Sequence, residues 1–402
     1  MVNEFLIKSK KAKENNVSSI IFCVLQVVQL FMIYSLATEN IMLERLCSYA
    51  IFGCGFVLIA TTMLFKGYIN GKDILFIVFV LYILAILLIS KAGSNVFEVA
   101  LYYVLMLSVW TASREIKLSK TAVRFLSFLV FAQSIMLVAL YFSPYAYEAY
   151  TEYANVSEEL TLGFDNPNQT GIILYATVCN MLILFRLNIN KILKFLYLPI
   201  MAALIYFLVL TKARVSLLSM IFIIVYYVVV YVLSYMRTNK KWQIKPHSSL
   251  IFLLIISSLI FVFVYMYMYK NNIFTNVKIM DKELFSGREH LYQNALNRWE
   301  NKLIGNIEVF SLQNSHNGLL TVLINTGVIG LILYVIHAFI NLNEIYKKYC
   351  LNVAAIGFVI IMGFFVNAWA EAAGLVGGTI YYINLLTVCV LTNKESEAVG
   401  IE

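Results

Sequence analysis

Two short segments of the sequence each place an arginine at the expected start of a helix. The turn 211–216, with the sequence TKARVS, joins two apolar runs and puts Arg214 in the first turn of the second run. In the other segment, Ser286 and Glu289 have the spacing of a capping box, so Arg288 falls in the first turn of the helix that follows. Free backbone N–H groups and the helix dipole favour an anion at such positions. A guanidinium there predicts a phosphate site.

Both arginines also have a plain structural explanation. Arg288 could be a solvated residue on an ordinary capped surface helix. Lys212 and Arg214 could extend toward anionic lipid headgroups, as long basic side chains do at a membrane surface. The residues alone leave both interpretations open.

A histidine and a carboxylate follow later in the chain. His316 is one of four histidines and stands with Asn317 just before an apolar run. A histidine can accept a proton near neutral pH, as a general base must; the alternative is a polar cap on the next helix. Glu371, between the last two apolar runs, could orient such a base, or it could be a solvated loop charge.

The elements that must hold these residues are membrane helices. Of the 402 residues, 61% are hydrophobic and 13% charged, whereas soluble proteins carry about 25% charged residues. The mean hydropathy is +0.81. The net charge of +8 comes from short basic clusters between apolar runs, which indicates membrane topology and no nucleic acid. The six cysteines show no paired spacing and no CxxC, so neither a disulfide framework nor a zinc site is predicted.

About twelve apolar runs are long enough to cross roughly 30 Å of hydrocarbon. They are residues 18–37, 46–65, 74–90, 96–112, 121–142, 169–187, 192–210, 214–236, 249–269, 318–341, 352–368 and 374–391. The first run is too long for a signal-peptide core and is expected to stay as a span. The predicted fold is an all-α polytopic membrane protein with a single domain over residues 1–402.

Orientation follows from lysine and arginine. With the N-terminus inside, nineteen of the thirty basic residues fall in inner segments and four in short outer loops. This bias predicts cytoplasmic tails at 1–17 and 392–402. It also places two longer loops outside: the acidic loop 143–168, with no Lys or Arg, and the long loop 270–317. There is no internal repeat and nothing like the inverted-repeat, broken-helix pattern of transporters.

Two helices are expected in or beside these loops. In the long loop, an apolar stripe predicts an amphipathic helix that lies on the bilayer or on the bundle; the stripe comprises Leu291, Ala295, Trp299 and Leu303. After the acidic loop, the segment 166–168 (Asn-Pro-Asn) has the pattern of a helix start, with proline at the first helical position.

The order of these motifs resembles the O-antigen ligase and polymerase (Wzy-type) family over roughly residues 160–335. The resemblance rests on Gly163-Phe164 with the asparagines of 166–168, the turn 211–216, the SGR element 286–288 with Trp299, and His316-Asn317 followed by Gly327 and Gly330. One departure is that the segment after the tryptophan, 303–306, keeps a single glycine where the family often has a Pro-x-Gly-x-Gly stretch.

The resemblance implies a C-type glycosyltransferase-like fold in the bacterial plasma (inner) membrane, with its site on the outer face. It implies an undecaprenyl-pyrophosphate-linked glycan donor and acceptor, with no metal and no cofactor; the sequence has no P-loop, GxGxxG, DxD or HExxH motif. By position, Arg214 and Arg288 would hold the pyrophosphate, and His316 would be the base or would position the acceptor. The other expected substrate contacts are Lys212, Asn168, Asn317 and Glu371.

The implied activity is polymerisation of lipid-linked repeat units into an O-antigen or capsular-type polysaccharide. A ligase, which moves a finished glycan to another acceptor by nearly the same chemistry, is the first alternative. A flippase for lipid-linked oligosaccharides is the alternative from the transport class, although it does not need a long outer loop. Membrane lipids, a chain-length regulator and a flippase are the other expected partners.

Overall fold

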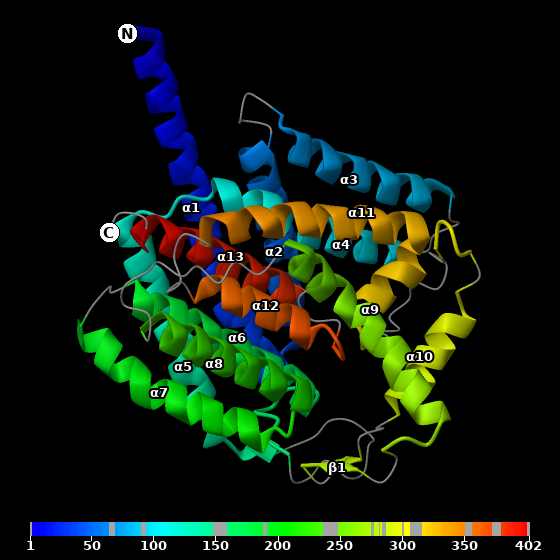
Figure 1. The fold of residues 1–402 in the computed structure, drawn as a ribbon. Coiled ribbons are helices and arrows are strands. Elements are labelled where there is room, and N and C mark those ends of the chain that lie inside the picture. The colour runs from blue at the N-terminus through cyan, green and yellow to red at the C-terminus, as the bar shows by residue number, and fades with distance from the viewer. Residues whose placement is uncertain are drawn as a thin grey trace.

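The computed structural model describes residues 2–63, 69–89, 94–147, 159–187, 191–235, 248–274, 277–280, 282–283, 287–299, 301–305, 316–349, 356–371 and 379–399. This part of the chain forms a bundle of α-helices with one 3-10 turn and one two-stranded antiparallel sheet (Figure 1). In chain order the elements are α1 (Val2–Ala37), α2 (Ile41–Met63), α3 (Gly71–Ile89), α4 (Ser94–Glu115), α5 (Lys120–Tyr141), η1 (Pro144–Tyr147), α6 (Pro167–Arg186), α7 (Lys191–Leu210), α8 (Arg214–Tyr235), α9 (Ser248–Lys270), β1 (Lys278–Ile279), β2 (Lys282–Glu283), α10 (Arg288–Asn297), α11 (Gly318–Tyr349), α12 (Gly357–Asn367) and α13 (Thr379–Val399).

The helices have the length and composition of membrane spans. Each of the twelve predicted apolar runs overlaps a helix. Among the described residues, eight helices are long and apolar enough to cross a membrane, and α8 and α12 add shorter apolar stretches, Arg214–Val229 and Gly357–Asn367. The predicted all-α, multi-pass class is confirmed at this level. α10 is the helix predicted inside the long loop.

Several helices begin where a polar side chain satisfies the free backbone N–H groups of the first turn. Asn166 accepts from the N–H of Gln169 at 2.9 Å, with Pro167 as the first residue of α6, so the predicted helix start is confirmed. At α3, Asn70 and Asp73 cap each other: Asn70 Oδ1 accepts from the Asp73 N–H at 2.9 Å, and Asp73 Oδ2 accepts from the Asn70 N–H at 3.1 Å. This reciprocal cap has capping-box spacing, with an asparagine and an aspartate in its two positions.

The first and last helices continue into the segments expected as tails. α1 begins at Val2 and α13 ends at Val399. No glycine or proline lies between residues 2 and 37, and the basic segment before the first apolar run contains Lys, Glu and Ala, which favour helix.

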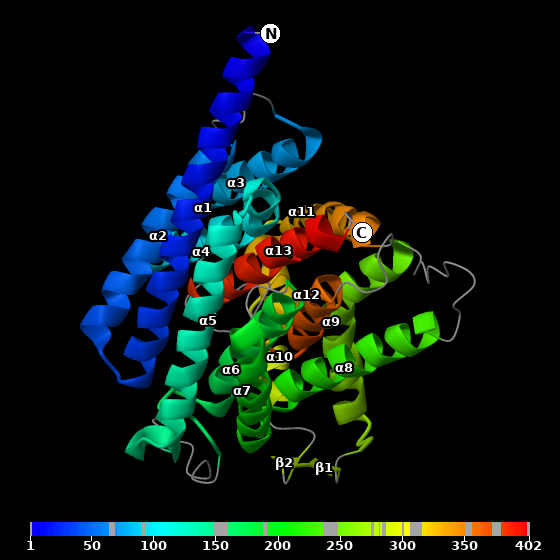
Figure 2. The same cartoon turned by 90° about the vertical axis from the view of Figure 1, so that its left-hand side faces the viewer.

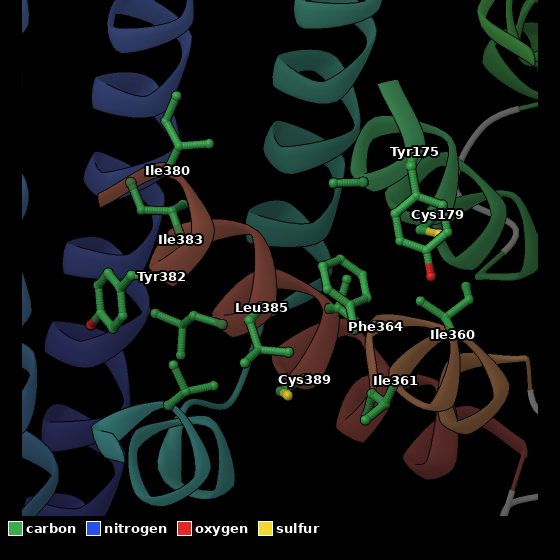
Figure 3. Close-up of a cluster of buried hydrophobic side chains, with 14 of the residues drawn as sticks. Tyr175, Cys179, Ile360, Ile361, Phe364, Ile380, Tyr382, Ile383, Leu385 and Cys389 are labelled. Atoms are coloured by element: carbon green, nitrogen blue, oxygen red, sulfur yellow. The ribbon is translucent and has the colours of Figure 1, made fainter. Parts of the chain in front are cut away.

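The core is centred on α6, α12 and α13. Figure 3 shows Tyr175 and Cys179 of α6 facing Phe364 of α12, and Tyr382 and Cys389 of α13 continuing the same apolar cluster. All five side chains are buried. Figure 2 shows α1, α2 and α5 side by side along one edge of the bundle, with α8 and α9 toward the opposite edge. α12 lies between α8 and α9 and packs on both of them.

α11 is broken at Gly327, whose φ of 65° and ψ of −172° are not helical. The amides freed after the break donate to the segment 301–305: Val328 N–H to the Lys302 carbonyl at 3.0 Å, and Ile329 N–H to the Leu303 carbonyl at 3.2 Å. Figure 1 shows the ribbon of α11 turning sharply at its right-hand end. The predicted apolar run 318–341 therefore forms a helix with one break, because a pairing with the segment 301–305 replaces the helix's own hydrogen bonds at this point.

An ion-pair cluster joins α3, α4 and α11. Arg114 lies 3.1 Å from Asp73 and 3.8 Å from Glu344, and Lys72 pairs with Glu344. The Asp73 and Arg114 side chains are only 4% and 13% exposed. Partly buried charges need such partners, since an unpaired buried charge is strongly destabilising. The cluster fixes the start of α3 against the end of α4.

Candidate functional site

The carboxylate of Glu371 joins two of the predicted functional residues. Its Oε1 accepts a hydrogen bond from Arg288 Nη2 at 2.8 Å, and its Oε2 lies 3.2 Å from His316 Nδ1. The Glu371 side chain is 7% exposed, compared with 13% for Arg288 and 34% for His316. The interpretation of Glu371 as a solvated loop charge is therefore wrong. Glu371 lies beside His316, where it can orient the imidazole ring, which is the other interpretation that the sequence allowed.

The backbone that leads to Glu371 is anchored to α9. Trp369 donates through Nε1 to Ser257 Oγ at 2.7 Å, and Ser258 Oγ donates to the Ala368 carbonyl at 2.8 Å. Ser258 lies near the middle of α9. The end of α12, and the carboxylate that follows it, are consequently held inside the bundle and not on a surface loop.

Asn317 ties the start of α11 to the same place. Its Oδ1 accepts from the Leu320 N–H at 2.9 Å and lies 3.1 Å from Ser258 Oγ, whose single proton it shares with the Ala368 carbonyl. Its Nδ2 donates to the carbonyls of Ser258 and Trp369 at 2.8 and 2.7 Å. The side chain is fully buried. Asn317 therefore caps α11 and positions its neighbour His316, and a contact with substrate stays a prediction.

His316 does not serve as the cap of α11, because Asn317 does. Its backbone has a φ of 49°, in the left-handed region that few residues other than glycine, asparagine and aspartate adopt. The ring is the most exposed member of the group formed with Glu371 and Arg288. If Nδ1 donates to Glu371, then Nε2 carries the lone pair that could accept a proton.

Arg288 lies in the first turn of α10, as predicted, and is its first residue, but the helix start differs from a capping box. Gly287 precedes it with a φ of 85° and no side-chain cap, and Ser286 lies outside the described residues. Glu289, the expected partner of Ser286, is 7% exposed and turned into the bundle. Arg288, one position before Glu289, donates to Glu371.

The apolar face of α10 differs in phase from the predicted stripe. Tyr292 is fully buried, and it packs with Ala295, Leu296 and Trp299 against α9 and the first half of α11. Leu291 is 40% exposed and Leu303 64% exposed. The predicted stripe therefore holds in part. Ala295 and Trp299 pack with the buried face, Leu303 lies beyond the end of α10 at Asn297, and Leu291 lies outside the face that Tyr292 buries. Of the two predicted locations, the helix lies on the bundle.

Arg214 is the first residue of α8 and is about half buried. Burial disfavours the charged form of the Arg214 guanidinium most, the positive charge of Arg288 adds to this effect, and Tyr265 and Glu159 favour the charged form. The two arginines, 74 positions apart in the chain, thus share one electrostatic environment. Lys212 stands in the preceding turn with a φ of 51° and is partly exposed.

The start of α6 lies against the same turn. A Cβ on Gly171 would overlap the Ala213 side chain and reach Ser216 Oγ at 3.4 Å, so Gly171 lies directly against this turn. Ser216 Oγ also accepts from Asn367 Nδ2 of α12 at 3.2 Å. Asn168 is partly exposed and lies one turn before Gly171. No hydrogen bond joins Asn168 to the arginines in the described part of the chain.

Some residues at the site were not predicted from the sequence. Glu159 is the buried carboxylate near Arg214, and Ser258 holds both α11 and α12. Tyr292 lies in the electrostatic field of Arg288 and Glu371, and burial raises its pKa. A polar Ser257-Ser258 pair inside an apolar run was an available signal for the serines. Nothing local distinguishes Glu159 from the other carboxylates of the acidic loop.

The candidate site combines two guanidinium groups, those of Arg214 and Arg288, with the imidazole of His316, which lies against the Glu371 carboxylate. Such a combination can bind a diphosphate and accept a proton next to it. Among the described residues, no cluster of three or more His, Cys, Asp or Glu side chains could hold a metal ion.

No family model matches the chain, and neither a curated protein nor a solved structure matches it. The resemblance to O-antigen ligases and polymerases therefore rests on the short motifs alone.

Proposed function

We propose that this protein is a membrane glycosyltransferase that joins lipid-pyrophosphate-linked oligosaccharide repeats into a polysaccharide. The observation that carries the proposal is the buried Glu371 carboxylate, which holds Arg288 and His316 together while Arg214 shares the field of Arg288. An anion-binding pair and an oriented base are the two parts that transfer from a pyrophosphate leaving group requires.

In the proposed reaction, a hydroxyl oxygen of the acceptor sugar attacks the anomeric carbon of the donor. The bond from that carbon to the pyrophosphate oxygen breaks, and lipid pyrophosphate leaves with the electron pair. Arg214 and Arg288 stabilise the negative charge that develops on it. The hydroxyl proton passes to His316 Nε2, a step worth about 10²–10⁴-fold in rate for a well-placed base.

The roles of the remaining predicted residues follow from their positions. Glu371 is proposed to accept from Nδ1–H of His316, which sets the tautomer with the basic lone pair on Nε2. Asn317 fixes the backbone beside His316 through its four hydrogen bonds. Lys212 and Asn168, both partly exposed at the ends of neighbouring helices, are proposed to contact the glycan or headgroup.

The test is the glycan profile of a strain that lacks the protein. Single repeats on the surface support the polymerase. Long chains that remain on the lipid carrier would show a ligase, and repeats retained on the inner face would show a flippase. Plasmid-borne wild-type protein should restore the long polymer, and a variant with Arg214→Ala and Arg288→Ala should not.

A further inference from the structure

We infer that Glu371 couples donor binding to activation of the base. When pyrophosphate binds Arg288, the positive charge that offsets the Glu371 carboxylate is neutralised, and the carboxylate acts more strongly on His316. The inference rests on the proposed function and adds an order of events to it: His316 becomes a strong base only after the donor is bound.

The first step of the argument is that Glu371 has one charge and two partners. One oxygen is bound by Arg288 at 2.8 Å and the other lies 3.2 Å from His316. The residue is 5% exposed, so little water is available to solvate the charge. In a partly desolvated site, charge interactions are stronger than in water. The positive charge of Arg288 therefore offsets part of the effect that the negative charge of Glu371 has on His316.

The second step is that a pyrophosphate competes for Arg288. A diphosphate carries at least two negative charges against the one of Glu371, and its oxygens can accept two parallel hydrogen bonds from a guanidinium. Arg214 strengthens this competition. The positive charges of Arg214 and Arg288 repel each other, so an anion that binds both side chains relieves this repulsion.

The third step is the effect on His316. A carboxylate held beside an imidazole favours its protonated form, and a guanidinium nearby disfavours it. When the donor neutralises Arg288, both effects change in the same direction and the proton affinity of His316 rises. On this inference, donor binding has to come before activation of the acceptor hydroxyl.

Other charged or titratable groups face this site from the surrounding elements. Glu159 acts on Arg214 from the segment before α6, Tyr265 lies on α9, and Glu289 and Tyr292 lie on α10. Glu289 is a matched control for Glu371, since it is also a buried carboxylate, at 7% exposure, and is adjacent to Arg288 in the chain.

The experiment is a pH titration of the histidine rings by ¹⁵N NMR on the full-length protein in detergent. The chain has four histidines, so His316→Asn assigns the His316 signal. The probe is undecaprenyl pyrophosphate without a glycan, and its binding is measured separately by calorimetry. In the wild-type protein, the probe should raise the pH of half-protonation of His316 by about 1 unit, as expected for a change in a neighbouring charge.

The Glu371→Gln variant should bind the probe and show less than about half of that rise, because only the direct field of the phosphates remains. Glu289→Gln should respond as the wild type does. Arg288→Gln tests the inference from the other side and does not depend on the folding of a Glu371 variant. Without any probe, its His316 should already be half-protonated at a higher pH than in the wild type.

Three results would overturn the inference, and they separate it from the proposed function. An equal rise in the wild type and Glu371→Gln would mean that pyrophosphate acts on His316 directly. Arginine-dependent binding with no rise in the wild type would end the coupling but leave the proposed function intact. Failure of the wild type to bind the probe, or binding that Arg214→Ala and Arg288→Ala leave unchanged, would remove both.

Discussion

Gly305 of the long segment before α11 and Gly327 inside α11 lie backbone to backbone. A Cβ on Gly305 would come within 2.6 Å of the Gly327 nitrogen, and a Cβ on Gly327 would come within 2.6 Å of the Gly305 nitrogen. Both residues have φ in the left-handed region. This contact connects the part of the chain that carries Arg288 to the helix that begins beside His316, so the site depends on it.

We therefore expect Gly305→Ala and Gly327→Ala each to lower the thermal stability of the detergent-solubilised protein. The left-handed backbone costs about 1–2 kcal/mol for a residue with a Cβ, and the overlap with the facing backbone adds to that. Gly287→Ala separates the two contributions, because Gly287 has a φ of 85° but open space around it. Gly53→Ala, in α2 with no atom near its Cβ, should be neutral or slightly stabilising. Equal melting temperatures for all four variants would contradict the contact.

The arginines should be required for activity but not for insertion. Arg214→Ala and Arg288→Ala are each expected to abolish polymer while the protein reaches the membrane at its normal level. Arg→Lys should restore little, because an ammonium cannot make the bidentate contact of a guanidinium. The measurement is polymer length and amount, with protein level determined on the same samples. Normal polymer in both alanine variants would mean that the side chains only reach toward lipid headgroups.

The proposed base is tested by His316→Asn. Asparagine tolerates the left-handed backbone at this position and cannot act as a base, so the variant should fold but lose at least about 10²-fold in polymerisation rate. Lipid-linked donor should still bind, because the arginines are intact. His290→Ala is the matched control, since the His290 side chain is 71% exposed and should be dispensable. Polymerisation of purified lipid-linked repeats at the wild-type rate by His316→Asn would exclude the catalytic role.

The orientation predicted from the charge bias can be tested with single cysteines in intact cells. Asn272→Cys, just after α9, should react with an impermeant thiol reagent, and Asn239→Cys should not. Position 239 lies outside the residues that the structure describes, so this prediction rests on the nineteen-to-four distribution of basic residues in inner segments and short outer loops. Labelling of Asn239→Cys alone would reverse the orientation and place the candidate site on the inner face.

What the sequence by itself determined about this protein is local. The apolar runs predicted the helical membrane class, and Asn166-Pro167 predicted the start of α6. Arg214 and Arg288 lie in the first turns of α8 and α10, as their patterns indicated. These predictions succeeded because hydrophobicity, caps and turns depend on residues close together in the chain.

Only the tertiary structure decided which of these residues act together. Glu371 is 83 positions from Arg288 and 55 from His316. At such separations no spacing pattern could predict whether Glu371 contacts these residues or is solvated in a loop. The break in α11 depends on Gly305, 22 residues earlier, and the buried face of α10 depends on the helices that receive it. The fold decides which residues pack together. Packed neighbours in turn decide whether a charge is buried, which partner compensates it and whether a helix keeps its own hydrogen bonds.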